Sequence, residues 1–137
     1  MKRVTKIEEL IALGPELLRL HKECKGCWQP DDSADFMQSV YKYFLGSYIF
    51  VEHEGDNVSA FFYFYPMEAQ HLHAWLAYVH PSIREKTKSY IAEMRKIVKA
   101  DGYKTVSSAT TRNHKSYKRW VSKFGLSFQY TVYKGDL

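Results

Sequence analysis

The chain has 137 residues, of which 45% are hydrophobic, and this composition fits one domain spanning residues 1–137. No stretch approaches the about 20 consecutive apolar residues of a membrane span, and two cysteines do not make a disulfide-stapled secreted module, so a cytoplasmic protein is expected. The net charge of +5 suits an anionic partner, but without a polybasic block or a known motif it does not favour nucleic-acid binding.

Helices are predicted first along the chain. Thr5-Lys6-Ile7-Glu8 has the form of a capping box, which begins a helix. Pro15 interrupts the apolar spacing and suits the first turn of a second helical piece. The second helix is predicted from Ala34 to Leu45, where apolar residues recur on one face, and Gly46 ends it.

A three-stranded meander follows. Tyr48 to Glu52 is a short apolar strand, and residues 54–57 have the turn chemistry of a hairpin. Val58 to Tyr65 is almost continuously apolar, as in a buried sheet strand, and Pro66 is expected to stop it. His71 to Val79 is the next strand.

The second half alternates helices with strands. A helix beginning at about Tyr90 closes at Asp101-Gly102, a C-terminal glycine signal. Further segments are predicted as a strand over Thr105–Ala109, a helix over Ser116–Phe124 and a strand over Leu126–Tyr133. The order α-α-β-β-β-α-β-α-β predicts an α/β fold with a single mixed sheet covered by helices.

A basic, hydroxyl-rich turn joins the strand that ends in Val79-His80-Pro81 to the next helix. Its residues are Arg84, Glu85, Lys86, Thr87, Lys88 and Ser89. Free N–H groups and the positive end of a helix dipole attract anions, so this turn is a candidate anion cradle. The alternative interpretation is a basic turn that is merely solvated.

The order of elements and these motifs resemble the GNAT acyltransferase superfamily, over most of the chain and best from about Phe61 onward. That family has V-x-P at the end of its fourth strand and then Q/R-x-x-G-x-G/A, where this chain has Val79-His80-Pro81 and the Arg84–Ser89 turn. Asn113 and Gly125-Leu126 stand where the family has an Asn and a G-F pair. The short length and the stretch HLHAWLAYVHPSIR look most like small GNAT-like proteins encoded by tailed bacteriophages.

The resemblance implies an acetyl-CoA-dependent N-acetyltransferase with a small-molecule or protein amine as acceptor. Tyr78 and Val79 would align the pantetheine through backbone bonds, and Asn113 would lie near it. The pyrophosphate would be held by Arg84, Lys86, Thr87, Lys88 and Ser89. The last strand of this fold often pairs at a dimer interface, so a homodimer is one expected assembly.

The chain departs from the family pattern at two places. Thr87 and Ser89 replace both glycines of the phosphate loop, and glycine permits positive φ and close backbone approach at no steric cost. Val121 stands where the family often has an acid tyrosine. Tyr117 lies one helical turn back and would act as the acid only if the helix shifts. The alternative function is therefore a non-catalytic GNAT-like binding module of a phage structural or host-interaction protein.

One histidine and two glutamates are the candidates for a general base. His71 and His73 share one face of a strand, because strand side chains alternate. His73 falls near the position where family members often carry a base, and a neutral imidazole can deprotonate an ammonium. Glu68 is a rival and Glu52 a weaker one, while the structural alternative is that His73 is an ordinary strand histidine.

Cys24-Lys25-Gly26-Cys27 is a CxxC sequence in a loop. It follows a helix rather than a strand, and no second pair of cysteines is present. Two reduced thiols are expected, and the alternative is a zinc site that includes His21. No metal is expected.

Overall fold

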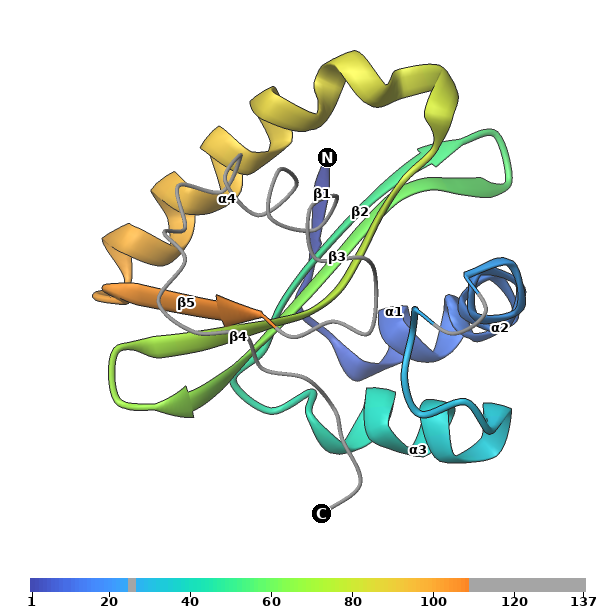
Figure 1. The fold of residues 1–137 in the computed structure, drawn as a ribbon, viewed down its shortest axis with the longest axis horizontal. Coiled ribbons are helices and arrows are strands. Elements are labelled where there is room, and N and C mark those ends of the chain that lie inside the picture. Colours follow the sequence, from blue (N-terminus) through green and yellow to red (C-terminus); the bar gives the residue numbers. More distant parts are fainter. Residues whose placement is uncertain (25–26, 109–137) are drawn as a thin grey trace.

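The computed structural model describes residues 1–24 and 27–108, and within them five strands form one sheet (Figure 1). The strands are β1 (Lys2–Val4), β2 (Tyr48–Glu54), β3 (Asn57–Glu68), β4 (His71–Val79) and β5 (Thr105–Ser108). They lie side by side in chain order. Pairs from β1 to β4 are antiparallel, and β4 and β5 are parallel. The mixed sheet predicted from the element order is therefore confirmed.

Helices cover both faces of this sheet. The helices α1 (Ile7–Ala12), α2 (Gly14–Glu23) and α3 (Ser33–Lys42) lie on one side (Figure 1). The 3₁₀ helix η1 (Pro81–Lys86) leads directly into α4 (Thr87–Ala100), which covers the other side and connects β4 to its parallel neighbour β5. The predicted helix over 116–124 and strand over 126–133 lie outside the described residues.

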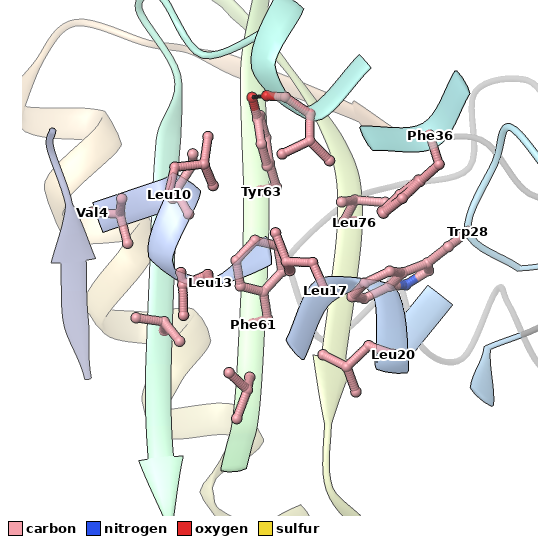
Figure 2. Close-up of a cluster of buried hydrophobic side chains, with 14 residues drawn as sticks. Val4, Leu10, Leu13, Leu17, Leu20, Trp28, Phe36, Phe61, Tyr63 and Leu76 are labelled. Atoms are coloured by element: carbon pink, nitrogen blue, oxygen red, sulfur yellow. Dashed lines mark hydrogen bonds between the residues drawn. The ribbon is translucent and has the colours of Figure 1, made fainter. Parts of the chain in front are cut away.

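Two hydrophobic clusters, one on each face of the sheet, explain the long apolar run in β3. Phe61 and Tyr63 point into the cluster under α1–α3, whereas Phe62 and Phe64 point into the cluster under α4. Figure 2 shows Phe61 and Tyr63 with Leu10 and Leu13 on one side and with Leu17, Trp28 and Phe36 on the other. A strand buried on both faces needs no polar alternation, so its sequence is apolar throughout.

One buried polar contact ties the sheet to α3. The Tyr63 hydroxyl donates a hydrogen bond of 2.6 Å to the carbonyl oxygen of Val40, and both residues are fully buried. Burial raises the pKa of Tyr63, which therefore stays a neutral donor.

Besides shifts of a few residues at the ends of α3 and β2, four features of the elements differ from the predictions. The predicted capping box is shifted by one residue, because the Glu9 carboxylate accepts the backbone N–H groups of Thr5 and Lys6 at 3.3 and 3.2 Å. β1 was not predicted, because a strand of three residues is too short to show an alternation of apolar and polar residues. Pro66 does not end its strand, because it pairs with Leu72 beside a register shift that tolerates its missing N–H.

The fourth correction concerns α4, which begins at Thr87, three residues before the predicted start. Two glycine predictions are confirmed by positive φ angles, +64° at Gly55 in the hairpin and +92° at Gly102 after α4. Among the residues described, no helix has the length and apolar character that crossing a bilayer requires.

Candidate functional site

β4 has an open edge beyond its short pairing with β5. The parallel pairing runs from His71 with Thr105 to Ala74 with Ser108. After Ala74, no strand within residues 1–24 and 27–108 pairs with this edge of β4. Among the residues described, the backbone groups on that side of the last residues of β4 therefore have no strand partner.

The antiparallel pairing with β3 decides which residues face this edge. The N–H of His80 donates to the carbonyl oxygen of Ser59 at 2.8 Å. Because hydrogen-bonded residues alternate along an antiparallel strand, Tyr78, two residues earlier, also exchanges hydrogen bonds with β3. By this alternation the backbone of Tyr78 faces β3, whereas Ala77 and Val79 face the open edge. A backbone role in binding pantetheine stays a prediction for Tyr78 and Val79, and of these two Val79 has its backbone on the open edge.

A β-bulge at Trp75 bends β4 where the open edge begins. Leu76 and Ala74 pair with consecutive residues of β3, which leaves Trp75 as the extra residue. Trp75 and Leu76 consequently both point to the α1–α3 side. The Trp75 ring lies 5.1 Å from that of Tyr63 and 5.3 Å from that of Tyr43. The apolar run of β4 carries no local signal for this bulge, since it appears only when two strands are paired.

The segment before α3 lies against the open edge. The indole N–H of Trp28 donates to the carbonyl oxygen of Ala77 at 3.3 Å, and the indole N–H of Trp75 donates to the carbonyl oxygen of Gln29 at 3.2 Å. Trp28 is buried. Sequence analysis missed this role, because nothing in the sequence places Trp28 beside a strand 49 residues away.

The predicted anion cradle is a helical turn rather than an extended loop. Arg84 and Lys86 lie in η1 and Lys88 lies in the first turn of α4, and all three are exposed. That first turn holds no acidic residue, so the positive end of the helix dipole adds to the three cations. Glu85 is the acidic residue among them.

Thr87 and Ser89 adopt ordinary helical conformations. Thr87 has φ −55° and ψ −46°, and Ser89 does not have positive φ. Thr87 is buried, and its hydroxyl donates to the carbonyl oxygen of Arg84 at 2.7 Å. This backbone therefore requires no glycine at either position, and the Thr87 hydroxyl is used inside the turn.

His73 lies on the α1–α3 face, where β4 and β5 are still paired. Its Nδ1 is 3.0 Å from the Ser107 hydroxyl oxygen, and its ring centroid is 5.3 Å from that of Tyr65. Burial, and secondarily the neighbouring His71, lowers the pKa of His73, so the imidazole is neutral near neutral pH. A neutral, half-buried imidazole has the protonation state that a general base requires.

The two candidate glutamates are less well placed than His73 to act as the base. Glu68 ends β3 opposite His71 and is exposed. Glu52 faces the α4 side, 3.1 Å from the amino group of Met1 and 3.3 Å from the Tyr90 hydroxyl, and the amino group lowers its pKa. Glu52 is thus on the opposite face of the sheet from His73. Asn113 and Tyr117 lie outside the described residues.

The cysteines and His21 belong to the core beneath α2. Cys24 and Cys27 are half-buried and pack against the α1–α3 cluster. The His21 ring is buried, stacks on Phe36 at 4.3 Å, and its Nε2 bonds the carbonyl oxygen of Pro30 at 2.8 Å. In the part of the chain that the structure describes, no three His, Cys, Asp or Glu residues are grouped to hold a metal ion.

Solved structures provide the comparisons, since no protein-family model and no curated protein matches the chain. An aminoglycoside 6′-N-acetyltransferase from Acinetobacter haemolyticus superposes with a TM-score of 0.71 at 13% identity, over 100% of this chain and 99% of that one. The acetyltransferase AAC(6′)-Iy, bound to the bisubstrate analogue CoA-S-monomethyl-acetylneamine, gives 0.67 at 12% identity over 96% and 92%. A GNAT-family acetyltransferase from Desulfovibrio desulfuricans gives 0.65 at 17% identity over 92% and 83%. At these identities the likeness is one of fold.

Proposed function

Because the chain has the GNAT acyltransferase fold, we propose that it is an acetyl-CoA-dependent N-acetyltransferase with an amine as acceptor. One observation carries this proposal. Beyond Ala74 the open edge of β4 leads through η1 to the start of α4, where three exposed cations lie. An extended amide-bearing arm that ends in phosphates matches both parts of this surface.

The residues present fit acetyl-CoA. The backbone groups of Ala77 and Val79 would hold the pantetheine arm as a strand neighbour holds a strand. Arg84, Lys86 and Lys88 would hold the pyrophosphate through their charged side chains. Thr87 would maintain the shape of this turn through its bond to Arg84, and Ser89 would contribute its exposed hydroxyl to binding.

His73 would act as the general base on the acceptor. An ammonium has no lone pair to attack with, so the acceptor must lose a proton before it reacts. The neutral imidazole would accept that proton at Nε2, which has no hydrogen-bond partner within residues 1–24 and 27–108. Acetyl-CoA supplies the activated thioester when bound. Glu68 is the second candidate base, and Tyr117 remains the predicted acid for the departing thiolate.

The acceptor would approach along the α1–α3 face beside His73. Tyr65 and Tyr43 stack on each other there at 4.3 Å, and Trp75 packs edge-on against them. These rings would form an aromatic wall for a small-molecule or protein amine. A single domain over 1–137, a cytoplasmic location, a phage origin and a homodimer remain predictions.

Titration calorimetry with acetyl-CoA, together with release of free CoA thiol on addition of an amine panel, tests this function. We expect His73→Gln to keep acetyl-CoA affinity and to lower kcat/KM by about 10²–10⁴-fold, the usual worth of a general base. The exposed His53 on β2 provides the matched control, His53→Gln, which should leave both unchanged.

Absence of heat with both acetyl-CoA and CoA at millimolar concentration would refute the enzyme. That outcome would support the non-catalytic module instead, for which the buried, internally bonded Thr87 hydroxyl and the missing glycines are the supporting observations. The basic start of α4 would then bind a partner protein instead of a cofactor.

A further inference from the structure

The Ser107 hydroxyl lies between two imidazole rings. Its oxygen is 3.0 Å from Nδ1 of His73 and 2.9 Å from Nε2 of His71. On the far side, Nδ1 of His71 is 2.6 Å from the hydroxyl oxygen of Thr105. The parallel register of β4 and β5, which pairs His73 with Ser107 and His71 with Thr105, creates this chain of four polar side chains.

We propose that Ser107 and His71 are positioning residues that decide which nitrogen of His73 carries the proton. The inference rests on the proposed function, in which His73 is the general base. It concerns the state of the base rather than its identity, and neither Ser107 nor His71 needs to contact a substrate.

The argument follows from the single proton of a hydroxyl. Ser107 can donate to one imidazole nitrogen only, so it must accept from the other. In the arrangement that makes His73 a base, neutral His71 holds its proton on Nδ1 and donates to Thr105, and its Nε2 accepts from Ser107. Ser107 then accepts from Nδ1–H of His73, and Nε2 of His73 carries the lone pair that a base needs.

Protonation of His71 would reverse the direction of the hydrogen bonds among these four side chains. A cationic imidazole donates from both nitrogens, so its Nε2–H donates to Ser107. The Ser107 O–H is then directed to Nδ1 of His73, and the His73 proton moves to Nε2. His73 stays neutral and loses its function as a base, because the lone pair now faces Ser107.

Within residues 1–24 and 27–108, few charged groups face these four side chains. From β3, Glu68 lies opposite His71 and the neutral Tyr65 lies opposite His73. From β5, the facing residues are the neutral Thr105 and Ser107. Burial raises the pKa of Tyr65, which keeps that phenol uncharged.

Nitrogen-15 NMR of the histidine side chains in the substrate-free protein tests this arrangement. At about pH 8 we expect His73 as the Nδ1–H tautomer. As the pH is lowered from this value, we expect His73 to change to the Nε2–H tautomer while still neutral. Ser107→Ala should abolish this dependence on His71.

Ser108→Ala is the matched control, since the Ser108 hydroxyl donates to the carbonyl oxygen of Ala74 at 3.2 Å and touches neither histidine. It should leave the tautomer of His73 unchanged. In the transfer assay Ser107→Ala should lower kcat by at least about tenfold with KM unchanged, because a catalytic imidazole in the wrong tautomer is not a base.

A His73 tautomer that does not respond to His71 in the wild-type protein would overturn the inference, as would full kcat in Ser107→Ala. Failure of the proposed function is distinguishable from either result. Absence of acetyl transfer by the wild-type protein would appear in the assay, whereas the tautomer is measured without substrate.

Discussion

The indole N–H of Trp28 donates a hydrogen bond of 3.3 Å to the carbonyl oxygen of Ala77 on the open edge of β4. Ala77 is one of two residues whose backbone faces that edge. The segment before α3 therefore occupies an acceptor group that a pantetheine arm would use. Binding of acetyl-CoA and the Trp28 contact are expected to compete for the same carbonyl oxygen.

Trp28→Phe is predicted to tighten acetyl-CoA binding. It removes the competing donor and keeps an aromatic ring in the core. One hydrogen bond contributes about 1 kcal/mol, which corresponds to about a fivefold decrease in Kd. Calorimetry measures the change. Trp75→Phe is the control, because its indole N–H donates to Gln29 rather than to β4, and weaker binding by Trp28→Phe alone would contradict the competition.

Loss of the cations at the start of α4 is predicted to weaken acetyl-CoA binding. Lys86→Gln and Lys88→Gln each remove one charged contact to phosphate, worth about 1.5 kcal/mol or on the order of tenfold in Kd. The exposed Lys99 in the last turn of α4 provides the control, Lys99→Gln. Equal affinities for all three variants would show that the phosphates bind elsewhere.

Thr87→Gly is predicted to destabilise the protein rather than to restore a family-like phosphate loop. Glycine inside a helix costs about 1 kcal/mol, and losing the buried bond to Arg84 adds about 1 kcal/mol. Urea unfolding measures the loss, and Thr87→Ser should retain most of the stability because it keeps the hydroxyl. Unchanged stability with tighter acetyl-CoA binding in Thr87→Gly would refute this account of the turn.

Stability is predicted to decrease as pH falls below about 6.5, because of His73. Burial lowers the pKa of His73 from 6.5, so the unfolded chain binds a proton at a pH where the folded chain does not. The contribution of His73 to the free energy of unfolding is complete above pH 6.5. It is lost as the pH falls through the pKa of His73 in the folded protein, with a slope of at most about 1.4 kcal/mol per pH unit.

Urea unfolding between about pH 5 and 7 isolates this effect. Glu9 and Glu52, whose pKa values are lowered from 4.5, lose their contributions only below that range. His73→Gln should give a flatter profile than the wild-type protein, and His53→Gln should not. A wild-type slope that survives in His73→Gln would assign the effect to another group.

Local patterns in the sequence were enough to predict most elements of the described fold. The strand His71–Val79 has the predicted bounds, and the turns at Gly55 and Gly102 have the positive φ angles that glycine favours. These features depend on residues adjacent in the chain, whose propensities and spacing are visible in the sequence. The basic turn was located for the same reason, although its helical conformation was not foreseen.

Features that depend on pairing between distant segments were decided only by the tertiary structure. The bulge at Trp75 and the outward direction of Ala77 follow from the register of β4 against β3. The position of Ser107 between two histidines follows from a parallel register with residues 34 and 36 positions away. The sequence determined which residues could supply a base and bind an anion, whereas register, set by the packing of both sheet faces, determined which of them meet.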